Sequence, residues 1–345
     1  MATSDAVTVD PQPAIRPFPT PEPLPAGVVL RHLRPPDDYR PMNAIANALR
    51  AVQGDNFYTT DEQFGRFYEN LSRCDPATDV AVAEIDGRIV GYGRAAWREE
   101  LDGIRVYEVI PFVDPAAAGQ HVFSAMVSAI ETRARAIAAD HPAGEKVLET
   151  FGSDLAPERD ALLQARGYEP VRFFYGMVRP SVDDLPDAPV PEGLEIREVR
   201  PEHLPAIWAA DQEAFRDEWG YTPATDADYQ LFLNEPVMGD TSLWRIAWDG
   251  DEVAGQVRSF INVEENARHN RLRGYTEHIS VRRPWRRRGL ARALIAASFP
   301  LLRARGMTEA ALAVDTENPS GALRVYEGCG FRPVSRSITY RKPIA

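Results

Sequence analysis

The chain has 345 residues, which exceeds the size at which a single hydrophobic core stops growing, so two domains are expected. Apolar residues make up 44% and charged residues 26%, as in an ordinary globular protein. A net charge of -12 at pH 7 argues against nucleic acid and anionic membranes as partners, because the overall field repels phosphate groups.

The beginning of the chain carries no segment that looks like a targeting signal or a membrane span. A basic region followed by an apolar stretch is absent, and no apolar run approaches the length of a bilayer. Cys74 and Cys329 lie one in each half, which is no disulfide framework. These features predict a protein of the cytoplasm.

Two proline-rich segments divide the chain. In residues 1–27, prolines at alternate positions remove amide donors and favour polyproline II, so we expect a disordered leader. A docking segment for a partner is the alternative. Residues 180–193 are rich in proline and acidic side chains, and we interpret them as an interdomain linker.

The segments after the two proline-rich stretches resemble each other. Three pairs match in the same order: Gly27–Pro35 with Gly193–Pro201, Val82–Gly91 with Ile246–Gly255, and Leu163–Tyr168 with Tyr326–Phe331. The repeat is far longer than that of a solenoid. It predicts a tandem duplication, with one domain over residues 28–179 and a second over residues 194–345.

The C-terminal copy alternates between strand and helix patterns. We expect strands near 195–200, 242–248, 253–263, 275–281, 310–314 and from 331 to about 342. We expect helices near 203–216, 290–305 and 319–327. This order predicts an α+β domain with one central sheet.

A basic, glycine-containing turn lies between the strand that ends at Val281 and the helix that starts near Leu290. A helix N-terminus exposes unpaired amides and a partial positive charge, which suit a phosphate group. Gly289 permits close approach of a ligand, and arginines add charge. The candidate phosphate-binding residues are Arg286, Arg287, Arg288, Gly289, Leu290 and Ala291. The alternatives are a solvated charge run and a nucleic-acid patch, although only Trp285 supplies an aromatic ring for the latter.

The segment Arg286–Ala291 resembles the Gln/Arg-x-x-Gly-x-Gly/Ala motif with which GNAT N-acetyltransferases bind acyl-coenzyme A. Asn318–Phe331 resembles a second motif of that family, Asn-x-x-Ala-x-x-x-Tyr-x-x-x-Gly-Phe. The resemblance covers the whole C-terminal half, and it implies two tandem GNAT-like domains, each with a mixed, mostly antiparallel sheet flanked by helices. It further implies acetyl-CoA as cosubstrate, no metal, and a primary amine of a small molecule as acceptor.

The family splays its fourth strand from its fifth, and strand-four amides pair with pantetheine. That implies cosubstrate contacts at Ile279 and Val281, with Asn318 at the pantetheine or fixing the loop; a place near a helix N-cap is the alternative for Asn318. The resemblance makes Tyr326 the general acid that protonates the leaving thiolate. A buried aromatic residue of the helix is the alternative.

Glu277 is the candidate general base. Strand alternation places it on one face with Ile279 and Val281, and His278 on the other. A desolvated glutamate with a raised pKa suits deprotonation of an amine. A cross-strand charge partner on a wet face is an equally good interpretation. The acidic stretch Asp211–Gly220 falls where the family's acceptor side lies, and it fits an amphipathic helix with solvated acids equally well.

The N-terminal copy departs from both motifs. Gly119 stands alone without a basic entry, Asp114 and Pro115 replace it, and Leu163 occupies the tyrosine position. We expect that this copy has lost catalysis and serves as a packing partner or as a wall of the acceptor site, although weak coenzyme binding by it stays open.

The sequence predicts an N-acetyltransferase whose C-terminal domain is active, as a monomer or homodimer. The layout is similar to that of the mycothiol synthases, which acetylate a cysteinyl amine on a sugar-bearing thiol. A peptide N-terminus and an aminoglycoside-like amine stay open as acceptors. A non-catalytic acyl-CoA sensor or scaffold is the alternative from another class.

Overall fold

The structure is a computed structural model that describes residues 16–344, except residues 22, 54–57, 117–119, 185–186, 235–236 and 238. In the N-terminal half the described strands are β1 (Val28–His32), β2 (Val80–Ile85), β3 (Arg88–Glu99), β4 (Arg105–Val113), β5 (Lys146–Ser153) and β6 (Glu169–Arg179). The described helices there are α1 (Tyr39–Val52), α2 (Asp61–Glu69), α3 (Pro76–Asp79), α4 (Gln120–Ala139) and α5 (Pro157–Ala165).

The C-terminal half repeats this order. Its described strands are β7 (Glu195–Arg197), β8 (Trp244–Asp249), β9 (Glu252–Phe260), β10 (Arg273–Val281), β11 (Glu309–Asp315) and β12 (Arg332–Pro343). Its described helices are α6 (Leu204–Phe215), α7 (Asp226–Asn234), α8 (Val263–His269), α9 (Leu290–Ala304) and α10 (Ala322–Gly328), with short 3-10 turns η1 (Pro201–His203), η2 (Thr241–Leu243) and η3 (Arg283–Trp285). The helices α7 and α8 were not expected from the sequence.

All of these strands form one sheet in the order β1-β2-β3-β4-β5-β12-β6-β11-β10-β9-β8-β7. The pairs β4–β5 and β10–β11 are parallel. The other pairings among the described strands are antiparallel. The predicted α+β class, with two tandem units and a mixed, mostly antiparallel sheet, is therefore confirmed.

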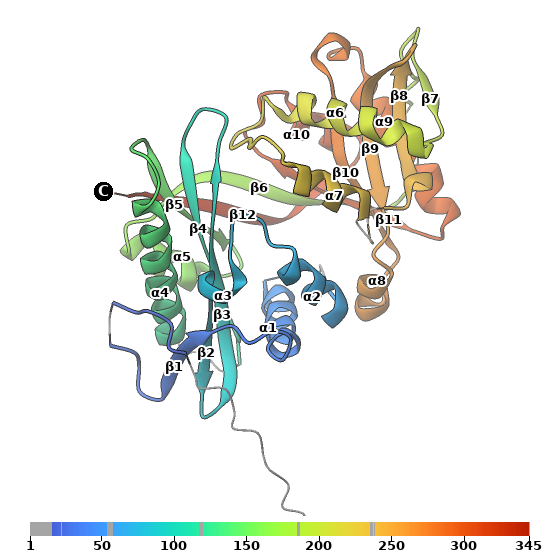
Figure 1. The fold of residues 1–345 in the computed structure, drawn as a ribbon. Helices are drawn as coiled ribbons and strands as arrows, with labels where there is room; N and C mark the ends of the chain where they lie inside the picture. The colour runs from blue at the N-terminus through green and yellow to red at the C-terminus, as the bar shows by residue number, and fades with distance from the viewer. Residues whose placement is uncertain are drawn as a thin grey trace, which may run out of the picture.

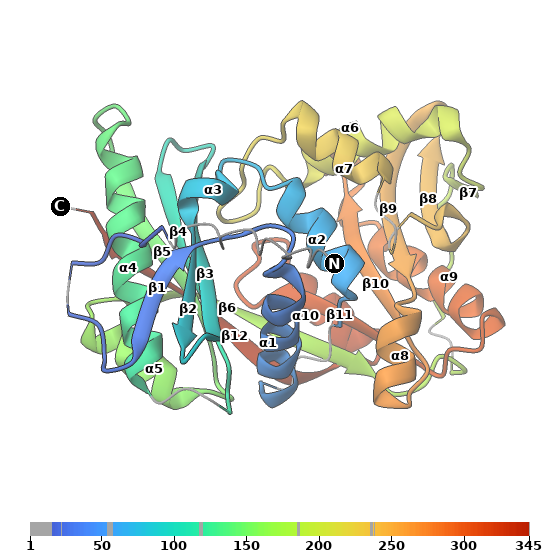
Figure 2. The same ribbon diagram turned by 60° about the horizontal axis from the view of Figure 1, so that its bottom comes forward.

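The two halves exchange their last strands. β12, from the end of the chain, pairs with β5 and β6, and β6 pairs with β11 of the C-terminal half. Figures 1 and 2 show β6 and β12 running between the two lobes. Ile338 and Tyr340 of β12 are buried in the N-terminal core, and Met177 of β6 is buried in the C-terminal core. We had expected each copy to complete its own sheet, whereas one sheet contains the strands of both halves. The interdomain linker at residues 180–193 stays a prediction.

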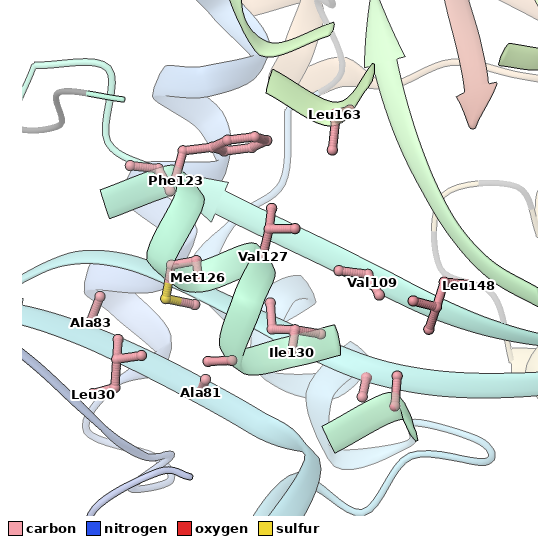
Figure 3. Packing of buried hydrophobic residues seen from close by; sticks show 14 of the residues in the cluster. Leu30, Ala81, Ala83, Val109, Phe123, Met126, Val127, Ile130, Leu148 and Leu163 are labelled. Carbon is pink, nitrogen blue, oxygen red and sulfur yellow. The ribbon is translucent and has the colours of Figure 1, made fainter. Parts of the chain in front are cut away.

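Helices cover both faces of the sheet, as the alternation along β2 shows. Ala81 and Ala83 pack in one buried cluster with α4, whereas Val80 and Val82 pack in another with α1 and α2. Figure 3 shows α4 side chains pointing onto strand residues of the first cluster, among them Leu30, Val109 and Leu148. In the C-terminal half, α9 and α10 pack in one such cluster and α6 in another.

Part of the expected leader belongs to the fold. Phe18 is only 2% exposed, packs in the N-terminal core, and donates its amide to Leu30 O at 3.0 Å. His32 in turn donates its amide to Arg16 O at 3.1 Å. The disorder that we expected up to residue 27 therefore does not apply to residues 16–18. Residues 1–15 lie outside the described residues, as does Gly119 of the N-terminal copy.

Candidate active site

The phosphate-binding candidate is a tight turn between β10 and α9. Pro284 lies in η3, and the Trp285 indole donates to Asp249 Oδ2 at 2.8 Å, which anchors the turn. Gly289 then takes a left-handed conformation with φ of 84° directly before Leu290 begins α9. A Cβ at Gly289 would meet nothing within 4 Å, so its conformation and the space above it leave the first amides of α9 accessible.

The arginines of this turn have different partners. Arg286 donates to Val281 O at 2.8 Å, to Asp217 Oδ2 at 2.6 Å and to Ala214 O at 3.0 Å. Hydrogen bonds from Arg283 and Arg286 hold the pKa of Asp217 well below its usual range. The Arg286 guanidinium therefore connects the turn to the end of α6. Its hydrogen bonds to protein groups leave few N–H donors for a ligand.

Arg288 donates to Glu192 O at 2.8 Å and does not line the cavity described below. Arg287 and Arg292 do line it, and both are exposed. Within the described part of the chain, no carboxylate forms a salt bridge with either of them. These two guanidinium groups are the cations that the turn presents to an anionic ligand. Arg292 was not singled out from the sequence, because it lies in the first turn of α9, just beyond the segment Arg286–Ala291.

β10 separates from β11 beyond its first residues. The parallel pairing ends at Tyr275 opposite Ala311, and the rest of β10 pairs only with β9. A bulge interrupts that second pairing between Glu277 and Ser280, with His278 at a φ of 47°. The strict alternation that we assumed from Glu277 to Val281 is therefore broken.

Glu277 reaches across this separation. Its Oε1 accepts a hydrogen bond from Ala313 N of β11 at 3.0 Å, so the carboxylate bridges the two strands. Burial raises the pKa of Glu277 to about 7, and the bond from Ala313 opposes that shift. A carboxylate with this pKa is divided between its protonated and ionised forms at neutral pH, which suits a group that accepts a proton.

Tyr326 lies on α10 with 7% of its surface exposed. Burial raises the pKa of its hydroxyl, and the charges of Glu277 and Glu218 add to the shift. The hydroxyl therefore stays protonated at neutral pH. It belongs to the buried cluster of the C-terminal core and also lines the cavity, so its position is compatible with both interpretations, and its role as general acid stays a prediction.

Asn318 connects the loop before α10 to the end of α6. Its Oδ1 accepts from Ser320 N at 2.9 Å, which folds the loop, and its Nδ2 donates to Glu218 Oε1 at 3.0 Å. Burial raises the pKa of Glu218 to about 7, and the bond from Asn318 opposes that shift. The sequence analysis noted the acidic stretch around Glu218 without singling this residue out.

One cavity of about 460 Å³ joins these parts. The residues predicted from the sequence that line it are Ile279, Val281, Arg286, Arg287, Gly289, Leu290, Ala291, Asn318 and Tyr326. Glu277 lies beside it in the strand separation, and Arg288 points away. Residues that the sequence did not single out also line it, among them Phe215, Asp217, Glu218 and Arg292.

Comparison with known proteins identifies the family. A sequence model described as "Acetyltransferase (GNAT) family" matches residues 44–143 and 204–331, which together exceed half of the chain. The chain belongs to the GNAT acetyltransferase family. It is therefore an acyltransferase, with one matched segment in each half, and the resemblance found in the sequence is confirmed.

GNAT relatives named mycothiol acetyltransferase align with most of the chain. The protein from Salinispora arenicola is 28% identical over 273 residues, which are 77% of this chain and 82% of the relative. The protein from Clavibacter michiganensis is 27% identical over 337 residues, 94% of this chain and 98% of the relative.

Solved GNAT structures share the fold. A GCN5-related N-acetyltransferase from Sphaerobacter thermophilus has a TM-score of 0.71 at 24% identity, covering 93% of this chain and 97% of that one. A tandem GNAT protein from the clavulanic acid biosynthesis pathway has a TM-score of 0.63 at 16% identity, covering 92% and 98%. The tandem arrangement thus recurs in a distant relative.

The described residues contain neither a candidate membrane span nor a candidate metal site. None of their helices has the length and apolar character to cross a bilayer. No three of their histidine, cysteine, aspartate or glutamate side chains gather as a metal site would need.

Proposed function

We propose that the C-terminal half of this GNAT enzyme transfers the acetyl group of acetyl-CoA to a primary amine of a small molecule. The observation that carries the proposal is the single cavity that joins the start of α9, the separation of β10 from β11, and Tyr326. Acetyl-CoA is the cosubstrate that GNAT acetyltransferases use. The residues at the cavity fit it, because a helix N-terminus and two exposed arginines suit a diphosphate.

The chain would hold the cosubstrate at two places. The first amides of α9, from Leu290 onward, bind the diphosphate together with Arg287 and Arg292. Backbone groups at Ile279 and Val281, on the part of β10 that has no partner in β11, bind the pantetheine. Asn318 and Ala291 complete the wall, and the small side chain of Ala291 keeps the first helical turn uncrowded.

Two side chains would handle the protons of the reaction. The amine nitrogen attacks the thioester carbon, a carbon–nitrogen bond forms, and the carbon–sulfur bond breaks. Glu277 accepts the proton that the amine loses, as its pKa near neutrality permits. Tyr326 keeps its proton until the thiolate leaves and then donates it to the sulfur.

The relatives guide the choice of acceptor. Because several are named mycothiol acetyltransferase, a cysteinyl amine on a sugar-bearing thiol is the first acceptor to test. A peptide N-terminus and an aminoglycoside are the others. We further propose that the enzyme works in the cytoplasm as a monomer or homodimer, without nucleic acid or membrane as partner, in keeping with the net charge of -12.

Acetyl transfer to cysteinyl glucosamine, a free tripeptide and kanamycin tests the proposal, with the acetylated product detected by mass spectrometry. Ala291→Glu is the blocking variant, because it places a carboxylate where the diphosphate would bind while keeping a favourable charge for the helix start. Ala291→Ser is its control. We expect turnover in the wild type and the control and none in the blocked variant. Acetyl-CoA binding without transfer to any of a wider amine panel would favour a sensor instead.

A further inference from the structure

The loop that follows α6 brings a second carboxylate to the reaction centre. Glu218 lines the cavity, its Oε1 accepts from Asn318 at 3.0 Å, and its charge acts on the hydroxyl of Tyr326. The proton transfers proposed above use Glu277 and Tyr326 and leave Glu218 without a task. Its position beside the general acid calls for one.

Glu218 has no cationic partner within the described residues. The charged groups that act on it are Asp315, Asp211 and Arg286, and burial is the main reason why its pKa rises to about 7. Arg286 is already committed to Asp217 and to two backbone carbonyls. A half-buried carboxylate in this position gains most from a ligand that brings its own positive charge.

Two loops meet at Glu218: the loop after α6, which contains Glu218, and the loop before α10, which contains Asn318. Contacts from the N-terminal half hold both loops. Arg172 of β6 donates to Asp315 Oδ2 at 2.9 and 2.8 Å and to Glu317 O at 3.1 Å, which fixes the loop that presents Asn318. The same guanidinium lies 5.6 Å from the ring centre of Trp219, the neighbour of Glu218. The Arg172 side chain is only 12% exposed.

A second group of contacts, from the exchanged strand β12 and from the turn after β3, secures the same loop. Arg341 of the exchanged strand β12 lies 4.3 Å from the ring centre of Trp219 and is bound to Glu149 at 2.8 Å and to Glu100. Leu101, in the turn after β3, donates its amide to Tyr221 O at 2.9 Å. Residues 219–221 are thus held both by the N-terminal half and by the strand β12, which pairs with it.

We propose that Glu218 binds the ammonium group of the acceptor beside Tyr326, and that Arg172 is the positioning residue through which the N-terminal half keeps Glu218 there. The inference rests on the proposed function and adds to it a class of acceptor, an amine that arrives as a cation. The ammonium gives one proton to solvent before its nitrogen attacks, and Glu277 takes the second as the amide forms. It also gives the N-terminal copy a task in the reaction, since its strand β6 supplies a residue that contacts both loops.

The test removes one ion pair near the site and one far from it. Arg172→Met with Asp315→Asn is the site pair, and Arg133→Met with Asp79→Asn is the control pair. Both arginine–aspartate pairs are short, at 2.8 and 2.7 Å, with mostly buried aspartates. Both aspartates also accept a backbone amide, from Glu317 at 3.0 Å and from Asp75 at 2.7 Å, which an asparagine still can do.

The first measurement does not depend on activity. The full chain is labelled with carbon-13 in its glutamate carboxyl groups and titrated, and Glu218→Gln identifies the signal of Glu218. We expect a midpoint near 7 in the wild type and the control pair. Because the charge of Asp315 itself raises this pKa, Asp315→Asn alone is the reference for losing that charge, and the midpoint of the site pair should lie closer to 4.5 than that of the single variant, since water reaches the carboxylate. A midpoint in the site pair no lower than in Asp315→Asn, or an equal shift in the control pair, overturns the role of Arg172.

The second measurement is kinetic and uses the amine of the panel that the wild type acetylates fastest. We expect Glu218→Gln and the site pair each to raise the KM for that amine at least about tenfold. In Glu218→Gln the Kd of acetyl-CoA should stay unchanged, because that substitution leaves the loop of Asn318 in place. The control pair should leave both constants as they are. An unchanged KM in Glu218→Gln overturns the inference while the proposed function stands. Absence of acetyl transfer by the wild type refutes the proposed function, and with it the ammonium role, whereas the titration still decides the role of Arg172.

Discussion

The two halves of the molecule carry the same cleft with different contents. In each, a parallel pair of strands is joined for only a few residues, β4 with β5 at residues 105–108 and β10 with β11 at residues 273–275. A long helix follows the first strand of each pair, α4 and α9 respectively. The same backbone scaffold is therefore present twice, and the side chains decide how large a cavity each copy holds.

In the N-terminal copy the corresponding cavity is smaller, and the Arg159 side chain extends along its wall. Its cavity of about 210 Å³ is lined by Val113, Phe123 and Arg159 among others. The Arg159 guanidinium lies 5.2 Å from the ring centre of Phe123 and donates to Val113 O at 3.4 Å. Leu163, which the sequence repeat matches to Tyr326, is fully buried in the core (Figure 3). The comparison teaches that the duplicated fold keeps its packing while the residues that line the two clefts differ.

The sharpest test of this contrast changes the residue that differs between the two copies. Tyr326→Phe removes the proton donor, and we expect kcat to fall about 100-fold or more while the Kd of acetyl-CoA stays within about twofold. Leu163→Met is the matched change in the other copy and should leave kcat unaffected. Steady-state kinetics and calorimetric binding give both values. If Tyr326→Phe keeps its activity, the tyrosine is not the functional difference between the two clefts, and only their binding of acetyl-CoA can distinguish them.

The next test separates the arginines of the phosphate turn. Arg287→Ala and Arg292→Ala should each weaken acetyl-CoA binding roughly tenfold, with a smaller effect at high salt, because each removes a charge-assisted contact. Arg288→Ala should change the Kd little, since its guanidinium donates to Glu192 O instead. If Arg288 proves as important as Arg287, the charge of the whole run matters more than the direction of each side chain.

Folding stability offers a third test, because it reports the two carboxyls without any substrate. The pKa values of Glu218 and Glu277 are raised from 4.5 to about 7, so the folded state binds protons more tightly than the unfolded state. Stability should fall as the pH rises from about 4.5 to about 7 and stay low above it. Glu218→Gln and Glu277→Gln should each be more stable than the wild type at pH 8, by about 1–3 kcal/mol, and equal to it at pH 4.

Chemical denaturation across this pH range measures the effect. Glu158→Gln, an exposed glutamate at the N-terminal cleft, is the control for the general loss of a negative charge. Equal pH profiles for the wild type and both cleft variants would show that neither carboxyl is desolvated in solution.

The smallest expected effect concerns the N-terminal cleft itself. Arg159→Ala enlarges its cavity but adds none of the cations that the C-terminal turn presents. We therefore expect calorimetry to give one acetyl-CoA per chain in both the wild type and this variant. A second acetyl-CoA bound per chain in Arg159→Ala would show that the Arg159 guanidinium alone prevents acetyl-CoA from binding in the N-terminal cleft.

Much of the site follows from local sequence. Gly289 before Leu290, in a stretch that passes from strand to helix, predicts the turn that the structure shows, because backbone conformation there depends on near neighbours. The spacing from Asn318 to Tyr326 likewise reflects one loop and one helix. The direction of each arginine side chain does not follow, since Arg286 and Arg288 turn to Asp217 and Glu192, which are distant in the chain.

The sequence by itself determined the duplicated order of strands and helices, the phosphate turn and the identity of the tyrosine helix, because hydrophobic periodicity, glycine conformation and motif spacing act over a few residues. Tertiary structure alone decided the exchange of β6 and β12, the reach of Glu277 to Ala313, and the meeting of Glu218, Asn318 and Arg172. Each of these depends on contacts between segments far apart along the chain, whose pairing is selected by the packing of the whole sheet.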